Sequence, residues 1–277
     1  MIFFPNCKIN LGLHIVEKRS DGYHELETVF YPLPWSDLLE MTVQHDSEKA
    51  VDYKGTGIRI YGSKESNLCV RAYQLLAADH TIGPLKIHLH KIIPIGAGLG
   101  GGSSDAAFVL KGIDRLFGLG LSDSRLEEYA AKLGSDCPFF IRNRAVYATG
   151  RGEKFEDLKL KLDDYFFVVV KPRVHVSTAE AYSGVVPLRP ETSLKELIKK
   201  PIEKWKDVIR NDFEKTILDS YPSIRKIKKR LYDEGAVYAS MSGSGSAVYG
   251  IFREKVDLHL HFRSSTCWQG FGGEGMK

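Results

Sequence analysis

A run of glycines between residues 94 and 107 restricts the fold of this chain more than any other feature. The stretch reads PIGAGLGGGSSDAA, with glycine at positions 96, 98, 100, 101 and 102. Glycine adopts left-handed conformations and carries no side chain, so such a turn leaves backbone N–H groups bare for an anion. A strand-like segment (85–91) precedes the run, and a helical apolar stripe (107–117) follows it. The run therefore predicts a strand, a phosphate-binding loop and a helix whose N-terminus also faces the phosphate.

Two common nucleotide-binding motifs do not fit this run. Gly96-x-Gly98-x-x-Gly101 has the spacing of the dinucleotide fingerprint, but the preceding strand alternates polar and apolar residues. About 20 residues later, where that motif places a ribose-binding acid, the chain reads as a turn, LGLSDS. A Walker A loop needs Lys-Ser or Lys-Thr after the glycines, and neither follows. A simple turn capped by Ser103 would need only one or two glycines, so a phosphate cradle is favoured.

A second cluster of glycine and serine, SMSGSGSAVYGIF (240–252), runs into a strand-like segment. On its own this cluster is typical of a hairpin turn. Together with the first run, it predicts two loops that close on one ligand.

Composition is typical of an ordinary globular protein. The chain has 277 residues, more than an average single domain, so we expect two domains. Hydrophobic residues make up 43% and charged residues 27%, which argues against disorder. The 39 basic and 35 acidic residues leave a net charge of +4, too diffuse for a dedicated nucleic-acid binder.

The spacing of the cysteines and the length of the apolar runs indicate the cellular compartment in which the protein is expected. The four cysteines contain no CxxC pair, which argues against a zinc site or disulfides and favours a reducing cytoplasm. The apolar start of the chain is interrupted at Pro5, so we expect no secretory signal. The densest apolar run, 166–170, is far below the roughly 18 residues of a membrane helix and predicts a buried strand.

Hydrophobic periodicity predicts the elements around these loops. Alternating apolar residues from Ile9 predict a half-buried strand, with Lys8, Asn10 and His14 on its polar face. The Asp21-Gly22 turn signal then predicts an N-terminal β-hairpin. A helix is expected at 67–80, capped by Asn67. Three more are expected at LEEYAAKLG (126–134), SLKELIKK (193–200) and SIRKIKKRLYDEG (223–235), the last with its basic residues on a solvated face.

A turn-rich and charged region around 150–165 marks the expected change of unit. We therefore predict an N-terminal domain over 1–155, which contains the glycine loop, and a C-terminal domain over 156–277. The sequence does not reveal how ordered the tail CWQGFGGEGMK is, although its glycines suggest looseness.

Three pieces in this order, KINLGL, PxxxGLGGGSSDAA and a late SGSG before a strand, resemble the GHMP kinases, small-molecule kinases that act on galactose, homoserine, mevalonate and phosphomevalonate. The fragments NCKINLGL, RSDGYHEL, NLCVRA, LGSDCPFF, STAEAY and NDFE resemble, more narrowly, the 4-diphosphocytidyl-2-C-methylerythritol kinase family. This likeness spans most of the chain. It implies an α+β fold: an N-terminal domain like ribosomal protein S5 domain 2, a ferredoxin-like C-terminal domain, and an active site in the cleft between them.

The resemblance also implies a reaction, which is transfer of the ATP γ-phosphoryl group to the 2-hydroxyl of 4-diphosphocytidyl-2-C-methylerythritol in non-mevalonate isoprenoid biosynthesis. Mg²⁺ is expected to accompany the ATP. By resemblance, Asp136 is the catalytic base and Lys8 the cation that keeps it ionised and polarises the reacting oxygen. The implied ATP-binding residues are Pro94, Gly96, Ala97, Gly98, Leu99, Gly100, Gly101, Gly102, Ser103 and Ser104, with Asn67 and Leu68 near adenine.

The implied substrate site grips a cytosine ring. Tyr23 stacks on the base, His24 reads its edge, Tyr182 supplies a second aromatic face, and Asn10 accompanies Lys8. Asn211 and Asp212 of the NDFE fragment match a motif without an assigned role. The metal ligands stay open, with Ser103 and Ser104 as candidates.

Two alternatives remain at this point. The first is another kinase of the superfamily, which would share the ATP loop but lack the cytosine grip. The second is a non-catalytic nucleic-acid binder, because S5-like folds occur in ribosomal proteins; the dispersed charge argues against it. We expect a small-molecule substrate with a cytidine diphosphate group, no nucleic-acid or membrane partner, and a cytoplasmic monomer or homodimer.

Overall fold

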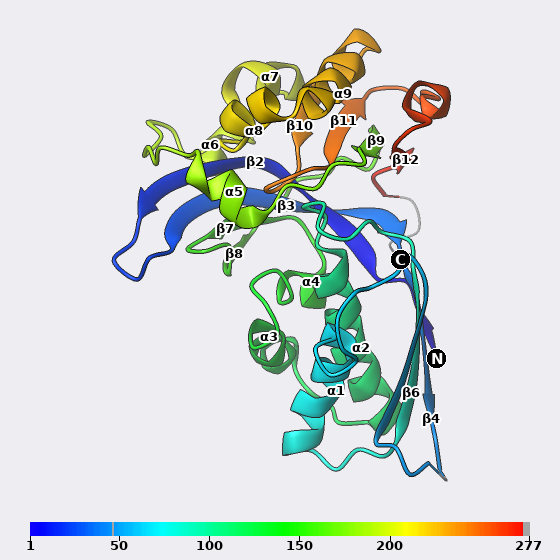
Figure 1. The fold of residues 1–277 in the computed structure, drawn as a ribbon. Helices are drawn as coiled ribbons and strands as arrows, with labels where there is room; N and C mark the ends of the chain where they lie inside the picture. The colour runs from blue at the N-terminus through cyan, green and yellow to red at the C-terminus, as the bar shows by residue number, and fades with distance from the viewer. Residues whose placement is uncertain (46, 274–277) are drawn as a thin grey trace. The chain divides into compact units, whose positions relative to one another are not determined.

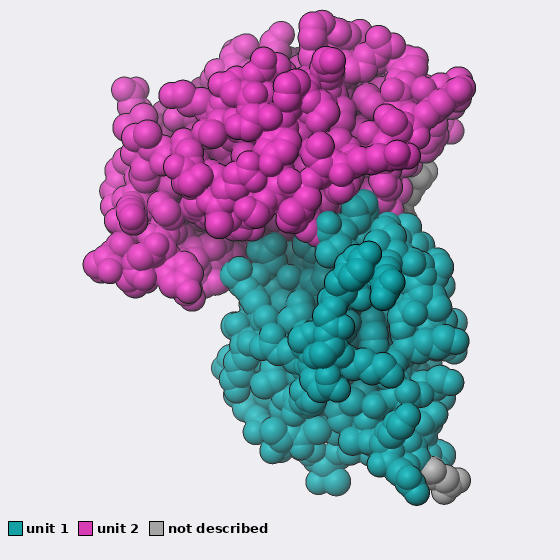
Figure 2. All heavy atoms as spheres, viewed as in Figure 1, with its two compact units in different colours: residues 1–7, 36–95, 100–144 teal, residues 8–35, 96–99, 145–277 magenta. Residues whose placement is uncertain are grey.

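The computed structural model describes residues 1–45 and 47–273 and forms two compact units (Figure 2). Unit 1 contains residues 1–7, 36–95 and 100–144, and unit 2 contains residues 8–35, 96–99 and 145–277. The units therefore interleave along the chain, and the glycine loop contributes four residues, 96–99, to unit 2. The boundary after residue 155 stays a prediction.

Unit 1 is a four-stranded sheet with helices packed on it (Figure 1). In sheet order the strands are β1 (Ile2–Phe3), β4 (Leu38–Val43), β6 (Leu85–Lys91) and β5 (Val51–Gly57), all antiparallel except the parallel β5–β6 pair. Its helices are α1 (Leu68–Asp79), α2 (Gly101–Phe117), α3 (Asp123–Ala131) and α4 (Phe139–Arg142). Burial alternates along β6, so one face of this strand meets the core, as its sequence predicts.

Helix α1 begins where its sequence predicts. Asn67 has extended backbone dihedrals, and its side-chain oxygen accepts a hydrogen bond from the N–H of Cys69 at 2.9 Å. An Asn side chain in this position satisfies one of the N–H groups that a helix leaves unpaired at its start. The predicted cap at Asn67 is confirmed.

Unit 2 contains two four-stranded sheets. The first has the order β2 (Asn6–Lys18), β3 (His24–Ser36), β7 (Val146–Thr149) and β8 (Lys154–Asp157), with β2 assigned to unit 2 from Lys8 onward. The second is antiparallel, in the order β10 (Tyr238–Met241), β11 (Val248–Phe252), β9 (Phe166–Lys171) and β12 (Thr266–Phe271). A shared hydrophobic core joins residues of β2 and β3 to residues of the second sheet.

The helices of unit 2 follow β9 and include the amphipathic α9. They are α5 (Thr178–Ser183), α6 (Leu194–Leu197), α7 (Trp205–Val208), α8 (Glu214–Ser220) and α9 (Pro222–Asp233), with 3-10 turns at Ile202–Lys204 and His259–Phe262. Helix α9 packs on β10 and β11 (Figure 1). It buries Ile224, Ile227 and Leu231, which confirms the predicted apolar stripe.

The expectation of a half-buried N-terminal strand is wrong. The strand from Asn6 is buried on both faces as far as Ile15, and the polar side chains Lys8, Asn10 and His14 are each no more than 3% exposed. The His14 ring bonds the Glu27 carboxylate, which also accepts the N–H of Leu194, so a later segment covers this face. The tail, whose order the sequence leaves open, forms β12 on β9 over 267–271. Its residues 274–277 lie outside the described residues.

The four cysteines all lie in the described part of the chain, and all are free thiols. None of the helices formed by the described residues combines the length and apolar character that a membrane span requires.

Candidate active site

The glycine loop joins β6 to α2 as a strand–loop–helix unit, as predicted. Gly98 and Gly100 have φ values of 78° and 69°, in the left-handed region that favours glycine. Gly100 is the N-cap of α2, and the first intrahelical bond runs from the N–H of Ser104 to its carbonyl at 2.9 Å. The N–H groups of residues 101–103 therefore have no acceptor within the helix, and they form the positive end of its dipole.

The Gly/Ser loop, residues 242–247 between β10 and β11, contacts the part of the glycine loop that belongs to unit 2. The Ser242 hydroxyl donates to the carbonyl of Gly98 at 2.8 Å, and the N–H of Ala247 donates to the carbonyl of Ala97 at 3.2 Å. The N–H of Lys8 holds the carbonyl of Leu99 at 2.9 Å. The two glycine clusters thus lie together, and their shared ligand stays a prediction.

Gly98 is the position where a side chain would be least tolerated. A Cβ placed there would lie 1.9 Å from the carbonyl oxygen of Ser242. Replacing Gly98 with Ala should therefore lower the free energy of unfolding by about 1–3 kcal/mol, from the left-handed φ and the displaced loop. It should also raise the KM for ATP about tenfold. Denaturant unfolding and steady-state kinetics measure both effects, with Gly83→Ala as control, because its Cβ would meet only Phe117 at 3.6 Å.

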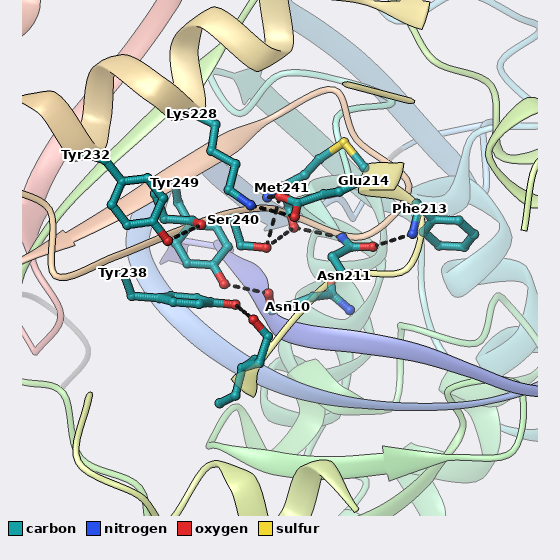
Figure 3. A network of polar contacts seen from close by, with 12 residues as sticks. Asn10, Asn211, Phe213, Glu214, Lys228, Tyr232, Tyr238, Ser240, Met241 and Tyr249 are labelled. Carbon is teal, nitrogen blue, oxygen red and sulfur yellow. Dashed lines mark hydrogen bonds and ion pairs between the residues drawn. The ribbon is translucent and has the colours of Figure 1, made fainter. Parts of the chain in front are cut away.

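Asn211 also holds the Gly/Ser loop. Its side-chain amide donates to the carbonyls of Met241 and Gly243 at 2.9 and 2.8 Å, and its oxygen accepts the N–H of Phe213. Figure 3 shows the bonds of Asn211 to Met241 and to Phe213. The neighbouring Asp212 accepts the N–H of Ile15 at 2.8 Å. The NDFE fragment, whose role the sequence left open, therefore ties the Gly/Ser loop and β2 to the start of α8.

A buried ion cluster in unit 1 braces both ends of the glycine loop, and sequence reasoning missed it. Lys91, the last residue of β6, donates to the carboxylates of Asp37 and of Asp105, the latter at 2.7 Å. The other oxygen of Asp37 accepts the N–H groups of Ile92 and Ile93. Asp105 lies in α2, so the cluster links the strand before the loop to the helix after it.

The cluster holds two carboxylates and one ammonium group. Burial raises the pKa of Asp105 to about 8; the ammonium of Lys91 lowers it and the charge of Asp37 raises it. One oxygen of Asp105 and the hydroxyl of Ser104 have no hydrogen-bond partner among the described residues. Asp105 is therefore the member of the cluster that holds a proton near neutral pH.

This protonation gives unit 1 a pH-dependent stability. The folded-state pKa of Asp105 lies above its unfolded value of about 3.9, so between about pH 4 and 8 folding takes up a proton and stability falls as pH rises. The slope is about 1.4 kcal/mol per pH unit at most. Asp105→Asn, which stays neutral, should flatten the dependence of the free energy of unfolding between pH 5 and 8. An equal slope in both proteins would contradict this assignment.

Asp136, the predicted base, lies in the turn between α3 and α4 and is half-buried. The groups that shift the pKa of the next residue, Cys137, show what lies near Asp136. Burial raises the pKa of the Cys137 thiol to about 11; a hydrogen bond with Ser103 lowers it and the charge of Asp136 raises it. Asp136 and Ser103 therefore both lie close to Cys137, at the start of α2.

Lys8 and Asn10, predicted to share one face of a strand, do so in unit 2. The Lys8 ammonium donates to the side-chain oxygen of Asn10 at 2.7 Å and lies 4.5 Å from the ring centre of Phe30. The N–H of Asn10 donates to the hydroxyl of Ser242 at 3.2 Å. Asp136 belongs to unit 1 and Lys8 to unit 2, and their pairing stays a prediction.

Two of the three predicted base-gripping residues meet in unit 2. The rings of His24 and Tyr182 stack with centres 4.8 Å apart at 28°, and Phe213 packs edge-on against Tyr182. Tyr23 is exposed, and the guanidinium of Arg151 lies 4.8 Å from its ring centre. Because His24 and Tyr182 touch, no ring fits between them as they stand. A cytosine sandwich stays a prediction.

Comparison with known proteins identifies the family. Residues 67–144 match the model of the GHMP kinases N terminal domain, and residues 193–259 match that of the GHMP kinases C terminal. The chain is 52% identical over 271 residues to 4-diphosphocytidyl-2-C-methyl-D-erythritol kinase of Bacteroides fragilis, covering 97% of this chain and 98% of that one. It is 50% identical to the enzyme of the same name from Parabacteroides distasonis, covering 98% and 99% of the two chains.

Solved structures agree with this assignment. A crystal structure of 4-(cytidine 5'-diphospho)-2C-methyl-D-erythritol kinase matches with a TM-score of 0.80 and 32% identity, covering 99% of this chain and 100% of that one. The mevalonate kinase of Methanococcus jannaschii shares the fold, with a TM-score of 0.72 at 16% identity and 97% coverage of both chains. The predicted two-domain α+β fold of the GHMP kinases is confirmed. The chain belongs to the 4-diphosphocytidyl-2-C-methyl-D-erythritol kinase family of the GHMP kinases.

Proposed function

We propose that this protein transfers the γ-phosphoryl group of ATP to the 2-hydroxyl of 4-diphosphocytidyl-2-C-methyl-D-erythritol, a step of non-mevalonate isoprenoid biosynthesis. One observation carries the proposal: 52% identity along 97% of the chain to a kinase named for this substrate. The geometry of the glycine loop supports it, because bare N–H groups at a helix N-terminus suit the phosphates of ATP.

Phosphoryl transfer depends mainly on positioning and on neutralising charge, since the transferred group carries charge on three oxygens. In the proposed mechanism, the amides of the glycine loop and the N-terminus of α2 hold the triphosphate. The carboxylate of Asp136 accepts the proton of the substrate hydroxyl, and the ammonium of Lys8 stabilises negative charge during transfer. The network around Asn211 keeps the Gly/Ser loop against the glycine loop.

Mg²⁺ is part of the proposal because it commonly binds nucleotides through phosphate oxygens, water and only one or two protein oxygens. Among residues 1–45 and 47–273, no three His, Cys, Asp or Glu side chains are grouped as metal ligands. The hydroxyl of Ser104 is fully buried, lacks a partner in this part of the chain and lies in the first turns of α2. Ser104 is our candidate protein oxygen. The metal would neutralise phosphate charge there.

The proposed setting is the cytoplasm, which the four free thiols support because they suit a reducing compartment. A monomer or a homodimer stays a prediction.

The direct test supplies purified protein with ATP and Mg²⁺ and measures ADP. ADP should form when 4-diphosphocytidyl-2-C-methyl-D-erythritol is present and should not form with mevalonate or homoserine. Phosphorus NMR of the product should place the new phosphate on the 2-oxygen. Preference for mevalonate or homoserine would instead favour another kinase of the superfamily, and retention on RNA without kinase activity would favour the nucleic-acid binder.

Tyr182 tests the cytosine grip separately. Tyr182→Ala should raise the KM for the cytidyl substrate by about 5- to 150-fold, because stacking on an aromatic ring contributes about 1–3 kcal/mol per base. The KM for ATP should change little. Tyr182→Phe keeps the ring against His24 and should behave like the wild type. An unchanged substrate KM in Tyr182→Ala would remove Tyr182 from the base site.

A further inference from the structure

A pocket lies in unit 2, among residues that the proposed reaction does not use. Its volume is about 600 Å³, within the range of small-molecule sites. Helix α9 forms one wall, the segment around the 3-10 turn His259–Phe262 forms another, and the chain directly after β9 forms a third. Its apolar lining consists of Pro172, Val174, Ile227 and Phe262.

The rest of the lining is basic or hydroxylic. Arg173, Lys226 and Arg230 bring three cations, His261 brings an imidazole, and no acidic side chain is part of the lining. Arg230 is already engaged, because it pairs with Glu234 at 2.6 Å. The hydroxyls belong to Ser223, Ser264 and Ser265, and Ser223 lies in the first turn of the 12-residue α9.

Lys226 differs from the other basic residues of its run in α9, because they form ion pairs. Its run RKIKKR was predicted to be a solvated helix face, and four of its five basic side chains do pair with nearby acids. These pairs are Arg225 with Asp219, Lys228 with Glu214, Lys229 with Asp233, and Arg230 with Glu234. Lys226 is the remaining one, and it lines the pocket. Neither Lys226 nor Arg173 forms an ion pair with any residue that the structure describes.

The segment 173–175, which begins in the pocket wall, contacts both the Gly/Ser loop and the glycine loop. The carbonyl of Val174 accepts a hydrogen bond from the hydroxyl of Ser246 in the Gly/Ser loop at 2.8 Å. The next residue, His175, places its ring 3.1 Å from where a Cβ on Gly96 would lie. A ligand that orders Arg173 therefore acts on a segment directly bonded to the Gly/Ser loop and packed on the glycine loop.

We propose that this pocket is an effector site for a small phosphorylated organic molecule. The unpaired cations and serine hydroxyls bind the phosphate, and the lining of Pro172, Val174, Ile227 and Phe262 takes an apolar or ring portion. Occupancy changes the affinity for ATP through residues 173–175. The effect on ATP rests on the proposed kinase function, whereas the binding does not.

The binding test uses phenyl phosphate as the probe, and its binding is measured by calorimetry. The protein is saturated with ADP so that the nucleotide site is filled. Inorganic phosphate and phenol are titrated separately, and we expect phenyl phosphate to bind most tightly. The double variant Arg173→Gln, Lys226→Gln should weaken its binding about tenfold or more, because charge-assisted hydrogen bonds are the strong ones. Lys229→Ala, on the same helix but paired with Asp233, is the matched control and should bind normally. Absence of saturable binding, or equal binding by the double variant, would overturn the site.

The effector role has its own readout. Without the probe, the double variant should have wild-type kcat and KM. Phenyl phosphate should change the KM for ATP in the wild type by at least twofold more than in the double variant. The change seen in the double variant measures direct competition of the probe at the ATP site. Binding at the pocket with identical KM changes in both proteins would overturn the effector role. A wild type without any kinase activity would instead contradict the proposed function and leave the calorimetric result standing.

Discussion

Asp136→Asn is expected to lower kcat by about 10²- to 10⁴-fold, the usual contribution of a positioned general base. The amide has nearly the same shape as the carboxylate but cannot accept the proton of the substrate hydroxyl at neutral pH. The KM for ATP should stay close to the wild-type value, because the proposed phosphate contacts come from the glycine loop. The measurement is steady-state ADP release, with the thermal unfolding transition recorded by circular dichroism to confirm that the variant is folded.

Glu128→Gln is the matched control for this substitution. Glu128 is an exposed acid on α3, in the same unit, and pairs only with Arg125 among the contacts found for it. Its removal should change kcat less than twofold. If Asp136→Asn also stays within about threefold of wild type, Asp136 is only a turn residue before Cys137 and Pro138, and the base lies elsewhere.

Features set by neighbouring residues could be predicted from the sequence. Asn67 caps α1 because its side chain reaches an N–H two residues away, and that is visible in the residue order. The stripe of Ile224, Ile227 and Leu231 follows from helical spacing alone. The strand, glycine loop and helix also follow from local patterns, since each signal lies within about 30 residues.

Features set by distant partners could not be predicted. Alternation along β2 cannot reveal that the polar face around His14 is also covered, because its cover comes from Glu27 and from residue 194. The glycines of the tail suggest looseness without deciding it, and the pairing of the tail with the edge of β9 outweighs the glycine propensity. Family resemblance, and not local pattern, singled out Asp136 and Lys8, since each alone resembles a turn residue or a surface charge.

The ion cluster illustrates the same limit at the site itself. Asp37 and Lys91 are 54 residues apart in sequence; Asp37 directly precedes β4, Lys91 ends the neighbouring β6, and Asp105 joins them from the helix beyond the loop. Nothing in the order of residues pairs these three charges. Once β4 and β6 pair, the three charges meet directly before the glycine loop. The cluster therefore contributes to the stability of the loop.

Lys91→Met is therefore expected to lower the free energy of unfolding by about 3–5 kcal/mol, because it leaves the buried carboxylate of Asp37, with Asp105 beside it, without its cation. The Lys91 side chain is 2% exposed, so water cannot replace its ammonium. All three tryptophans, Trp35, Trp205 and Trp268, lie in unit 2, so their fluorescence reports that unit only. Hydrogen exchange of peptides covering residues 85–117 measures the effect where it arises, and exchange there should be the most accelerated.

Lys86→Met separates this effect from simple loss of a lysine. Lys86 is exposed on the same strand, and its replacement should change stability by no more than about 0.5 kcal/mol. Making all three side chains incapable of carrying charge, with Asp37→Asn and Asp105→Asn added to Lys91→Met, should restore part of the lost stability, because the cost comes from unpaired buried charge. If the single variant is as stable as the wild type, water or protonation already compensates the carboxylates. If the triple variant is less stable than the single one, the lost stability does not come from unpaired buried charge.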